Sequence, residues 1–399
     1  MRSMHVVLVT TELNRGEELY PGGLASYVYN VANGLIQNGH KATIILSGRI
    51  DQQYQFRGIP VIECIPSHGY LPGKIGKYLH RKIPETYGRL VKSWGIRKSI
   101  IKLIPNGQID IIQYTNWKAT GFFKIKHPSL IRISSYDPLF DNNPRSIHLD
   151  KRLAQWVEKI CIKRFKHVIG PGDYLANIIQ AELKLSKPIQ IIPTPYSPTE
   201  ANKDRDFRTP GMKLVLYAGT LSRFKGVELL CEIIDYYLSR FNDTCFLLCG
   251  KAGTMNGQSV RNTLIQLIEK YPGHIRWYEH VPKPDLMRAY QQSDAVLITS
   301  LIDNFPNTAL EAMSQGATVF ASEKASLGIL IKDGLNGYIM SSRMADDWTT
   351  RIRHHVFELH DTDRNEMKMS MPNTLQSFTM KNSMAKLLSY YQNVMVESR

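Results

Sequence analysis

The sequence has no apolar run long enough to cross a membrane, few cysteines, and fewer acidic than basic residues. A membrane-spanning helix needs about 18 to 20 apolar residues in succession, so we expect none. The opening MRSMHVVLVTTEL meets an acid within about ten residues of its apolar stretch, which argues against a signal peptide. The five cysteines are scattered without a Cys-x-x-Cys pair, so we predict reduced core thiols in a cytoplasmic protein and no metal site; they are Cys64, Cys161, Cys231, Cys245 and Cys249.

The excess of basic residues gives a net charge of +15, which suggests an acidic partner. Much of it lies in the segment 74–102, where nine Lys and Arg residues face one acid, Glu85, and alternate with apolar side chains. One interpretation is an ordinary solvated helix face. The other is a surface that meets anionic lipid or a lipid-linked phosphate, at the inner face of the plasma membrane. No nucleic-acid-binding module is visible, so we do not expect nucleic acid as the partner.

Both halves of the chain alternate short apolar segments, predicted as strands, with longer segments predicted as helices. The expected strands are 5–10, 41–46, 109–115, 130–135 and 167–172, then 213–219, 245–250, 275–280, 295–300 and 318–322. This alternation predicts parallel sheets with helices on both faces. We therefore predict an α/β protein with two Rossmann-like domains that face each other across a crevice, with ligands at the carboxyl ends of the strands.

A stiff, polar connector with Pro193, Pro195 and Pro198 separates the two halves. The expected boundaries are 1–195 for the first domain, 196–210 for the linker and 211–375 for the second domain. The last segment, 376–399, is amphipathic, and we expect it to form a terminal helix that crosses back to the first domain.

Two loops carry groups suited to phosphate. Gly22 and Gly23 stand directly before a predicted helix, where the backbone approaches a ligand closely and free N–H groups face an anion. Arg223 and Lys225 follow the first strand of the second domain, where a diphosphate would lie. The alternatives are a plain turn for the glycines and solvated surface charges for the two cations.

Two carboxylates bracket a predicted helix start in SLIDNFPNTALEAM. Pro306 and Asn307 favour a helix that begins near Asn307, and its N–H groups suit a phosphate. Glu311, one turn into the helix, would accept from a ribose diol. Asp303, in the loop, would be free to accept hydrogen bonds from the hydroxyls of a second group beyond the diphosphate. Together these groups suit a nucleotide sugar, which has hydroxyls at both ends and a diphosphate between them. The alternative interpretation is that Asp303 is an ordinary loop acid and Glu311 a solvated acid of the helix.

The motifs resemble those of the retaining glycosyltransferases of family 4, which have the GT-B fold. Asp303-Asn-Phe-Pro-Asn-Thr-Ala-Leu-Glu311 is similar to the acid-x₇-acid motif of that family, and AGTLSRFKGVELL to its Gly-Arg-Leu-x-x-x-Lys-Gly motif. EAMSQGATVFAS, IKDGLNGYIM and the Gly-Gly opening also resemble family segments. The resemblance covers nearly the whole chain and is weakest between residues 50 and 165, where acceptor sites vary.

The resemblance implies a transferase that needs no metal and no cofactor and that acts from a nucleotide-diphospho-sugar on a glycan or lipid-linked acceptor. It implies that Glu311 binds the ribose, Asp303 contacts the donor sugar, and Lys225 with Arg223 balances the diphosphate charge. The implied donor site comprises Gly22, Gly23, Gly219, Thr220, Arg223, Lys225, Gly250, His280, Val281, Asp303, Asn304, Phe305, Pro306, Asn307, Thr308 and Glu311.

Three departures from the family pattern matter. Thr220 stands where the family has an arginine, and Arg223 is the candidate to replace its charge. The first acid is Asp303 instead of glutamate. The crevice histidine of the first domain is absent. Three alternatives stay open: activity runs without it, Asp137 or a hydroxyl of Ser134, Ser135 or Tyr136 takes over part of its role, or activity is weak. Two alternatives stay open: a GT-B nucleotide-sugar epimerase, and a degenerate member that binds sugar nucleotide without catalysis.

Three further patterns are assigned ordinary roles. His280 is interpreted as structural or close to the nucleobase, not as a catalyst. HDTD at 360–363 is similar to a metal-binding Asp-x-Asp, but we place it in a polar loop without metal. IGPGDYLANII at 169–179 lacks the third glycine and the later acid of a dinucleotide fingerprint, so we predict a turn before a helix.

Overall fold

The computed structural model describes residues 3–13, 22–67, 71, 73–104, 109–140, 148–255 and 258–398. The chain forms two compact units. The first unit comprises Met1–Pro171, Leu175–Tyr196 and Phe378–Arg399, and the second comprises Gly172–Tyr174 and Ser197–Ser377.

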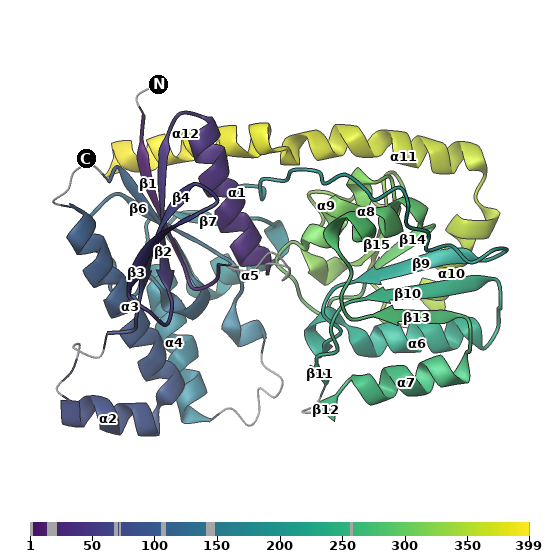
Figure 1. Ribbon diagram of the computed structural model, residues 1–399, viewed down its shortest axis with the longest axis horizontal. Coiled ribbons are helices and arrows are strands. Elements are labelled where there is room, and N and C mark those ends of the chain that lie inside the picture. The colour runs from purple at the N-terminus through teal and green to yellow at the C-terminus, as the bar shows by residue number, and fades with distance from the viewer. Residues whose placement is uncertain are drawn as a thin grey trace. The chain divides into compact units, whose positions relative to one another are not determined.

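Within its described residues, the first unit contains an eight-stranded sheet in the order β3-β4-β2-β1-β5-β6-β7-β8 (Figure 1). Its neighbouring strands pair in parallel, except for β3 and β4, which form an antiparallel pair at the edge. The strands are β1 (His5–Thr10), β2 (Lys41–Ser47), β3 (Gln52–Phe56), β4 (Ile59–Cys64), β5 (Ile111–Thr115), β6 (Ser129–Arg132), β7 (Val168–Gly170) and β8 (Gln190–Ile191).

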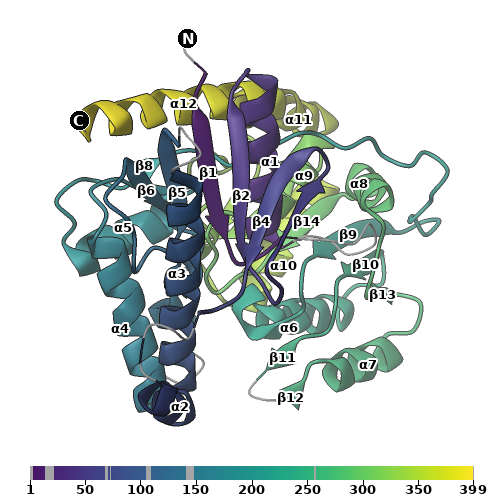
Figure 2. The ribbon, with the colours of Figure 1, turned by 60° about the vertical axis from the view of Figure 1, so that its left-hand side comes forward.

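Helices cover both faces of this sheet, because the central strands are apolar on both sides. On one face α1 (Gly23–Gln37) packs against β1 and β2. On the other, α3 (Pro84–Leu103) packs against β2 and β4 and runs beside α4 (Leu149–Lys163), as Figure 2 shows. The short helix α2 (Gly73–Lys82) precedes α3, and α5 (Asp173–Leu183) follows β7.

In the part of the second unit that the structure describes, six parallel strands form a sheet in the order β13-β10-β9-β14-β15-β16. Its strands are β9 (Lys213–Ala218), β10 (Thr244–Cys249), β13 (Ile275–Tyr278), β14 (Ala295–Ile298), β15 (Val319–Ser322) and β16 (Tyr338–Met340), with a small antiparallel pair of β11 (Thr254–Met255) and β12 (Gln258–Ser259). Its helices are α6 (Val227–Leu238), α7 (Arg261–Lys270), α8 (Lys283–Gln292), α9 (Asn307–Ser314), α10 (Ala345–Arg353) and α11 (Asp361–Leu375).

The last helix, α12 (Met380–Glu397), belongs to the first unit although the chain reaches it from the second (Figure 1). It packs against α1, where Gly34 allows close approach: a Cβ there would stand 2.7 Å from Cγ of Met384. Tyr391 donates a hydrogen bond to Gln113 of β5 at 2.7 Å. The terminal segment therefore forms part of the core of the first unit.

The strands expected from the sequence each overlap a strand of the structure. The sequence analysis missed the neighbouring strands β3 and β4, the short β8 and β16, and the small pair β11 and β12. The loop expected at HDTD is wrong, because Asp361 and Asp363 form the first turn of α11, where acids favour the helix dipole. The cysteines are free, and all but Cys231 are buried. Among the described residues, no helix is both long and apolar enough to span a bilayer.

Candidate functional site

The carboxyl edge of the second sheet gathers most of the predicted donor residues. From β9 the chain leads through α6 to β10 on one side, whereas β14 lies on the other side of β9. Such a reversal of strand order is where parallel α/β sheets bind ligands. Arg223 and Lys225 follow β9, Gly250 follows β10, and the segment 299–308 follows β14. Tertiary structure thus brings together groups that lie up to about 80 residues apart in sequence.

Lys225 and Asp303 form an ion pair across this edge. Lys225 ends the 3₁₀ turn η5 (Arg223–Lys225), and Asp303 lies between β14 and α9. Ser300 also donates to the Asp303 carboxylate at 3.2 Å, and Asn304 N–H donates to it at 2.9 Å. A cation and two further donors therefore engage the Asp303 carboxylate in this structure, and a sugar hydroxyl would have to share or displace these contacts.

Glu311 has a cationic partner that the sequence analysis missed. Lys283, at the start of α8, forms an ion pair with one carboxylate oxygen, and Tyr290 donates to the other at 3.4 Å. The Glu311 side chain is 14% exposed and that of Lys283 is 32% exposed. No local signal in HVPKPDL points to this role, because Lys283 reaches Glu311 only through the packing of α8 beside α9.

The segment between the two carboxylates starts α9 as expected, with the N-cap one position earlier than predicted. Pro306 is the N-cap and Asn307 the first helical residue, and the first turn contains no acid. Thr308 donates to the Ala218 carbonyl at the end of β9, at 3.2 Å. Phe305 is buried and has φ of 75°, a left-handed conformation that costs roughly 1–2 kcal/mol in a residue with a Cβ. This strained turn presents the N–H groups of α9 at the carboxyl edge.

Glycines make the close contacts between these loops possible. Gly226 has φ of 72°, and a Cβ there would stand 1.8 Å from the carbonyl oxygen of Thr299. A Cβ at Gly250 would stand 1.9 Å from the carbonyl oxygen of Gly219. The ends of β9, β10 and β14 therefore pack backbone against backbone.

The remaining predicted donor residues are spread along the same edge. Thr220 is exposed, and Tyr217 donates to its carbonyl at 3.1 Å. Arg223 is half-buried at the start of η5. His280 is exposed beyond β13, and the neighbouring Val281 is buried.

In the first unit, Gly22 and Gly23 start α1 at the carboxyl edge of the sheet, and the first turn has no acid. A Cβ at Gly23 would meet nothing within 4 Å, so its surroundings are open. A Cβ at Gly22 would stand 3.3 Å from the Glu12 carboxylate.

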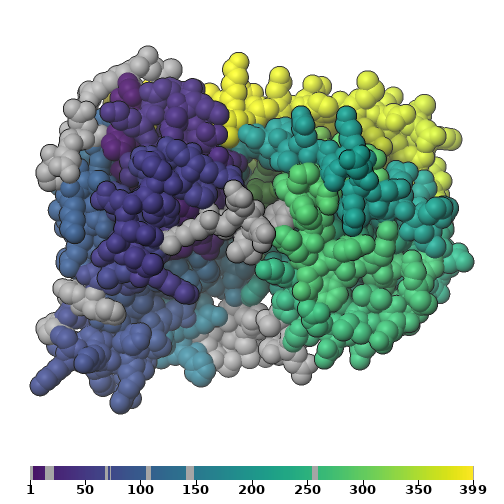
Figure 3. Space-filling model, viewed as in Figure 1, coloured from purple at the N-terminus to yellow at the C-terminus, as the bar shows by residue number. Residues whose placement is uncertain are grey.

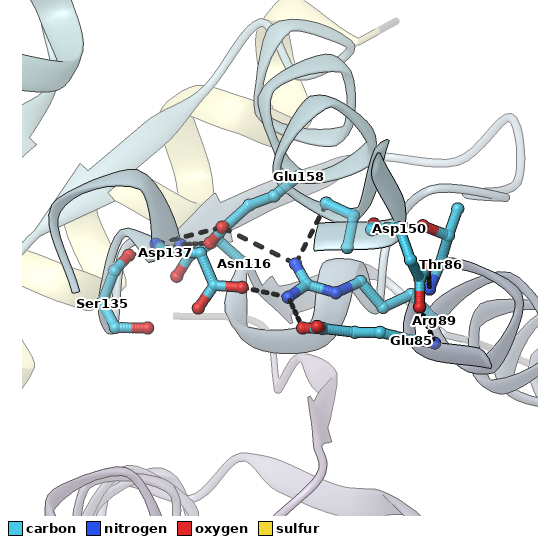
Figure 4. A network of polar contacts seen from close by, with 9 residues as sticks. Glu85, Thr86, Arg89, Asn116, Ser135, Asp137, Asp150 and Glu158 are labelled. Atoms are coloured by element: carbon cyan, nitrogen blue, oxygen red, sulfur yellow. Dashed lines mark hydrogen bonds and ion pairs between the residues drawn. The ribbon is translucent and has the colours of Figure 1, made fainter. Parts of the chain in front are cut away.

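Asp137 lies in a buried ionic network, drawn in Figure 4. Its carboxylate forms an ion pair with Arg89 of α3, whose side chain is 2% exposed. Arg89 also bonds to Glu85 at 2.7 Å and lies 3.8 Å from Glu158. These contacts weigh against the predicted catalytic role of Asp137, because an acceptor would have to compete with a buried guanidinium.

Within this network, Glu158 is the carboxyl whose pKa is shifted furthest from its ordinary value. It is fully buried, accepts from the Asn116 side chain at 2.7 Å and from Asp137 N–H at 3.1 Å. Burial, together with the charge of Asp137, raises the pKa of Glu158 to about 8, although Arg89 and the hydrogen bonds oppose the shift.

Two protein-family models match consecutive parts of the chain. The model "Glycosyltransferase Family 4" matches residues 21–200, and the model "Glycosyl transferases group 1" matches residues 199–365. Together they cover both units. The second match contains every group placed at the carboxyl edge of the second sheet.

Relatives of known name are similar to the chain at low identity. The D-inositol 3-phosphate glycosyltransferase of Corynebacterium jeikeium is 25% identical over 99% of this chain and 97% of its own length. For the protein of the same name from Corynebacterium aurimucosum, the match at 26% identity spans about half of either protein, 50% of this chain and 49% of the relative.

Solved structures share the fold. Sucrose-phosphate synthase from Thermosynechococcus elongatus has a TM-score of 0.75 at 15% identity, covering 99% of this chain and 100% of its own. HepE from Anabaena, solved in complex with UDP-glucose, has a TM-score of 0.68 at 15% identity, covering 98% of this chain and 100% of its own.

Proposed function

Because the chain belongs to the family 4 glycosyltransferases with the GT-B fold, we propose that it transfers a sugar from a nucleotide-diphospho-sugar to a glycan or lipid-linked acceptor. We further propose that the sugar keeps its anomeric configuration and that no metal is required. The observation that carries this proposal is the pair of carboxylate–lysine contacts, Asp303 with Lys225 and Glu311 with Lys283, on either side of the α9 start.

Lys225 supplies positive charge for the diphosphate. The phosphate competes with Asp303 for the Lys225 ammonium, and Lys225 then balances the charge that grows on the leaving nucleoside diphosphate. Arg223, two residues earlier on η5, adds to this field. The N–H groups at the start of α9 complete an anion site without a metal.

The two carboxylates hold the ends of the donor. Release of Lys225 to the phosphate leaves Asp303 lone pairs for hydroxyls of the transferred sugar. Glu311 keeps lone pairs for the ribose diol, while Lys283 and Tyr290 fix the position of its carboxylate. Lys283 is thus a positioning residue for the ribose site.

Transfer then needs positioning and charge stabilisation more than a protein nucleophile. The bond from the anomeric carbon to the diphosphate oxygen breaks, and the acceptor oxygen bonds to the same face of that carbon. The acceptor proton moves to the departing phosphate oxygen. This path does not require the crevice histidine that the sequence lacks.

The relatives suggest which compounds to test first. UDP-glucose is the first donor because HepE was solved with it. Inositol 3-phosphate is the first small acceptor because the corynebacterial relatives carry it in their names. Lipid-linked glycans follow, since the basic segment 74–102 suits an anionic membrane surface.

The deciding experiment is a thermal-shift screen of UDP-, GDP-, dTDP- and ADP-sugars without metal, on wild type, Glu311→Ala and the control Glu269→Ala. Glu269 is an exposed acid of α7, so its loss should not affect donor binding. A ligand at about 100 times its dissociation constant stabilises the folded state by roughly 2.7 kcal/mol. We expect nucleotide sugars with one particular nucleobase to stabilise the wild type and the control but not Glu311→Ala.

Product analysis separates the alternatives. Sugar transfer to an acceptor supports the transferase, and isomerised donor without acceptor supports the epimerase. Donor binding without turnover supports a degenerate binder. No stabilisation by any nucleotide sugar at millimolar concentration would overturn the proposal.

A further inference from the structure

A second cluster of functional groups lies in the first unit, at the carboxyl edge of its sheet. From β1 the chain leads through α1 to β2 on one side, whereas β5 lies on the other side of β1. The ends of β1 and β5 therefore flank a reversal of strand order, the position at which such sheets bind ligands. Glu12 comes two residues after β1, and Trp117 and Lys118 come directly after the residue that follows β5.

These three side chains contact one another. Trp117 hydrogen-bonds to the Glu12 carboxylate, and the charge of Lys118 acts on the same group. The Lys118 ammonium lies 4.4 Å from the centroid of the Trp117 ring. The Thr10 hydroxyl fixes the backbone of Glu12, accepting from its N–H at 3.1 Å and donating to its carbonyl at 3.0 Å.

Glu12 is half-buried, and burial raises its pKa, whereas Trp117 and Lys118 lower it. A carboxylate held at this depth keeps oxygen lone pairs that need hydrogen-bond donors. In the five positions that follow the carboxyl ends of β1, β5 and β6, the carboxylates among the described residues are Glu12 and Asp137. Asp137 is engaged by Arg89, so Glu12 is the better placed to meet a ligand.

Backbone strain holds the cluster in place. Lys118 and Ala119 have φ of 58° and 53°, two successive left-handed residues that both carry a Cβ. Strain of this kind persists where the surrounding structure enforces it and gathers at functional sites. Here it follows an ordered turn, in which Ala119 N–H donates to the Asn116 carbonyl at 2.7 Å.

We infer that Glu12, Trp117 and Lys118 form a binding site for the hydroxyl-rich ring of the acceptor, a sugar or cyclic polyol. Glu12 accepts from a ring hydroxyl, Lys118 donates to a neighbouring one, and the indole contributes an apolar surface for C–H groups. This inference rests on the proposed transferase function, because it assigns the acceptor side of the same reaction.

The test uses the full chain with myo-inositol, methyl α-glucoside and methyl α-mannoside as probes, followed by saturation-transfer NMR. The variants are Glu12→Gln and Lys118→Met, and the control is Glu269→Gln, an exposed carboxylate of α7 in the second unit. We expect at least one probe to bind the wild type and the control, and its affinity to fall about tenfold in both variants, as the loss of one charge-assisted hydrogen bond predicts. Unchanged melting temperatures in the absence of probe will show that the variants fold.

A donor-binding readout separates this inference from the proposed function. The thermal shift that nucleotide sugar induces should persist in Glu12→Gln, because the loss of a negative charge beside Gly22 does not weaken the binding of a diphosphate. Donor binding with probe affinities unaffected by either variant, or with no probe bound to the wild type, overturns the inference and leaves the donor proposal standing. Glu12-dependent probe binding without any donor binding would overturn the proposed function instead.

Discussion

At the scale of the residue, the surroundings of each carboxylate decide its role. Asp303 and Glu311 each pair with a lysine at a partly open edge, where a charged ligand can exchange with the partner. Glu158 has no such access, because it is fully buried beside Asp137 and Arg89. The first two therefore suit ligand binding, whereas Glu158 affects stability.

Glu158 should make the stability of the first unit depend on pH. Its pKa is raised to about 8 in the folded state from an ordinary value of 4.5, so the unfolded chain releases this proton at lower pH than the folded chain. The free energy of unfolding should therefore fall as pH rises from about 5 to 8, by on the order of 2–4 kcal/mol from this group. Denaturant unfolding across that range should show this decrease in wild type and in Glu182→Gln, but not in Glu158→Gln. Parallel curves for all three proteins would contradict the buried, protonated carboxyl.

Gly23 tests whether the α1 start binds the donor phosphate. Alanine adds a methyl group into open space, and alanine in place of a helical glycine adds up to about 0.5–1 kcal/mol of stability. We expect Gly23→Ala to unfold at equal or higher denaturant and to bind nucleotide sugar several times more weakly. An unchanged donor affinity would remove this helix start from the donor site.

At the scale of the element, the donor site depends on how the turn after β9 packs against the end of β14. Gly226 ends η5 and starts α6, and the Thr299 hydroxyl donates to the Lys225 carbonyl at 3.0 Å. Leu301 N–H donates to the Phe224 carbonyl at 2.9 Å. These contacts hold Lys225 and Asp303 at one edge.

Gly226→Ala should disrupt the packing of the turn after β9 against the end of β14. The new methyl group meets the Thr299 carbonyl, and the left-handed backbone adds its own cost, together roughly 2–5 kcal/mol of unfolding free energy. The control is Gly334→Ala, where φ is 76° but nothing lies within 4 Å of a Cβ. We expect the control to lose only the backbone contribution, about 1–2 kcal/mol. Equal losses in chemical denaturation would show that the contact with β14 is unimportant.

At the scale of the whole molecule, the part of the basic segment 74–102 that forms an exposed helix is α2. Arg89 and the apolar residues Val91 and Ile96 of α3 are buried. In α2 only Gly76 is buried, and Ile75 and Tyr78 are exposed among its cations. Figure 3 shows the first part of the chain at the surface in a space-filling view. An exposed cationic helix with apolar side chains suits an anionic lipid surface, which we propose as its partner.

Neutralising the α2 cations should weaken binding to vesicles that contain phosphatidylglycerol. The variant changes Lys74, Lys77, Arg81 and Lys82 to Gln, and the control changes the exposed Lys41, Lys126, Lys163 and Lys184 of the same unit. Each basic residue near such a surface contributes about 1 kcal/mol, so co-sedimentation should fall at least about tenfold for α2 alone. Binding should also weaken with salt, because mobile ions screen exposed charges. Equal losses of vesicle binding in the variant and the control would indicate that binding depends on the net charge of the protein and not on α2.

The sequence by itself determined the alternating strands and helices, the two sheets and the helix start at Asn307, because periodicity and helix-start residues act over a few neighbours. The family followed from motifs that resemble it. It also predicted Asp303, Lys225 and Glu311 as donor-site residues, from the helix start between the two acids and from the turn after a strand. Only the tertiary structure decided that Asp303 pairs with Lys225, that Lys283 holds Glu311 and that Asp137 is tied to Arg89. Glu12, Trp117 and Lys118 likewise meet only because β1 and β5 are neighbours. Partners that lie tens of residues apart leave no local pattern, so sheet order and helix packing select them.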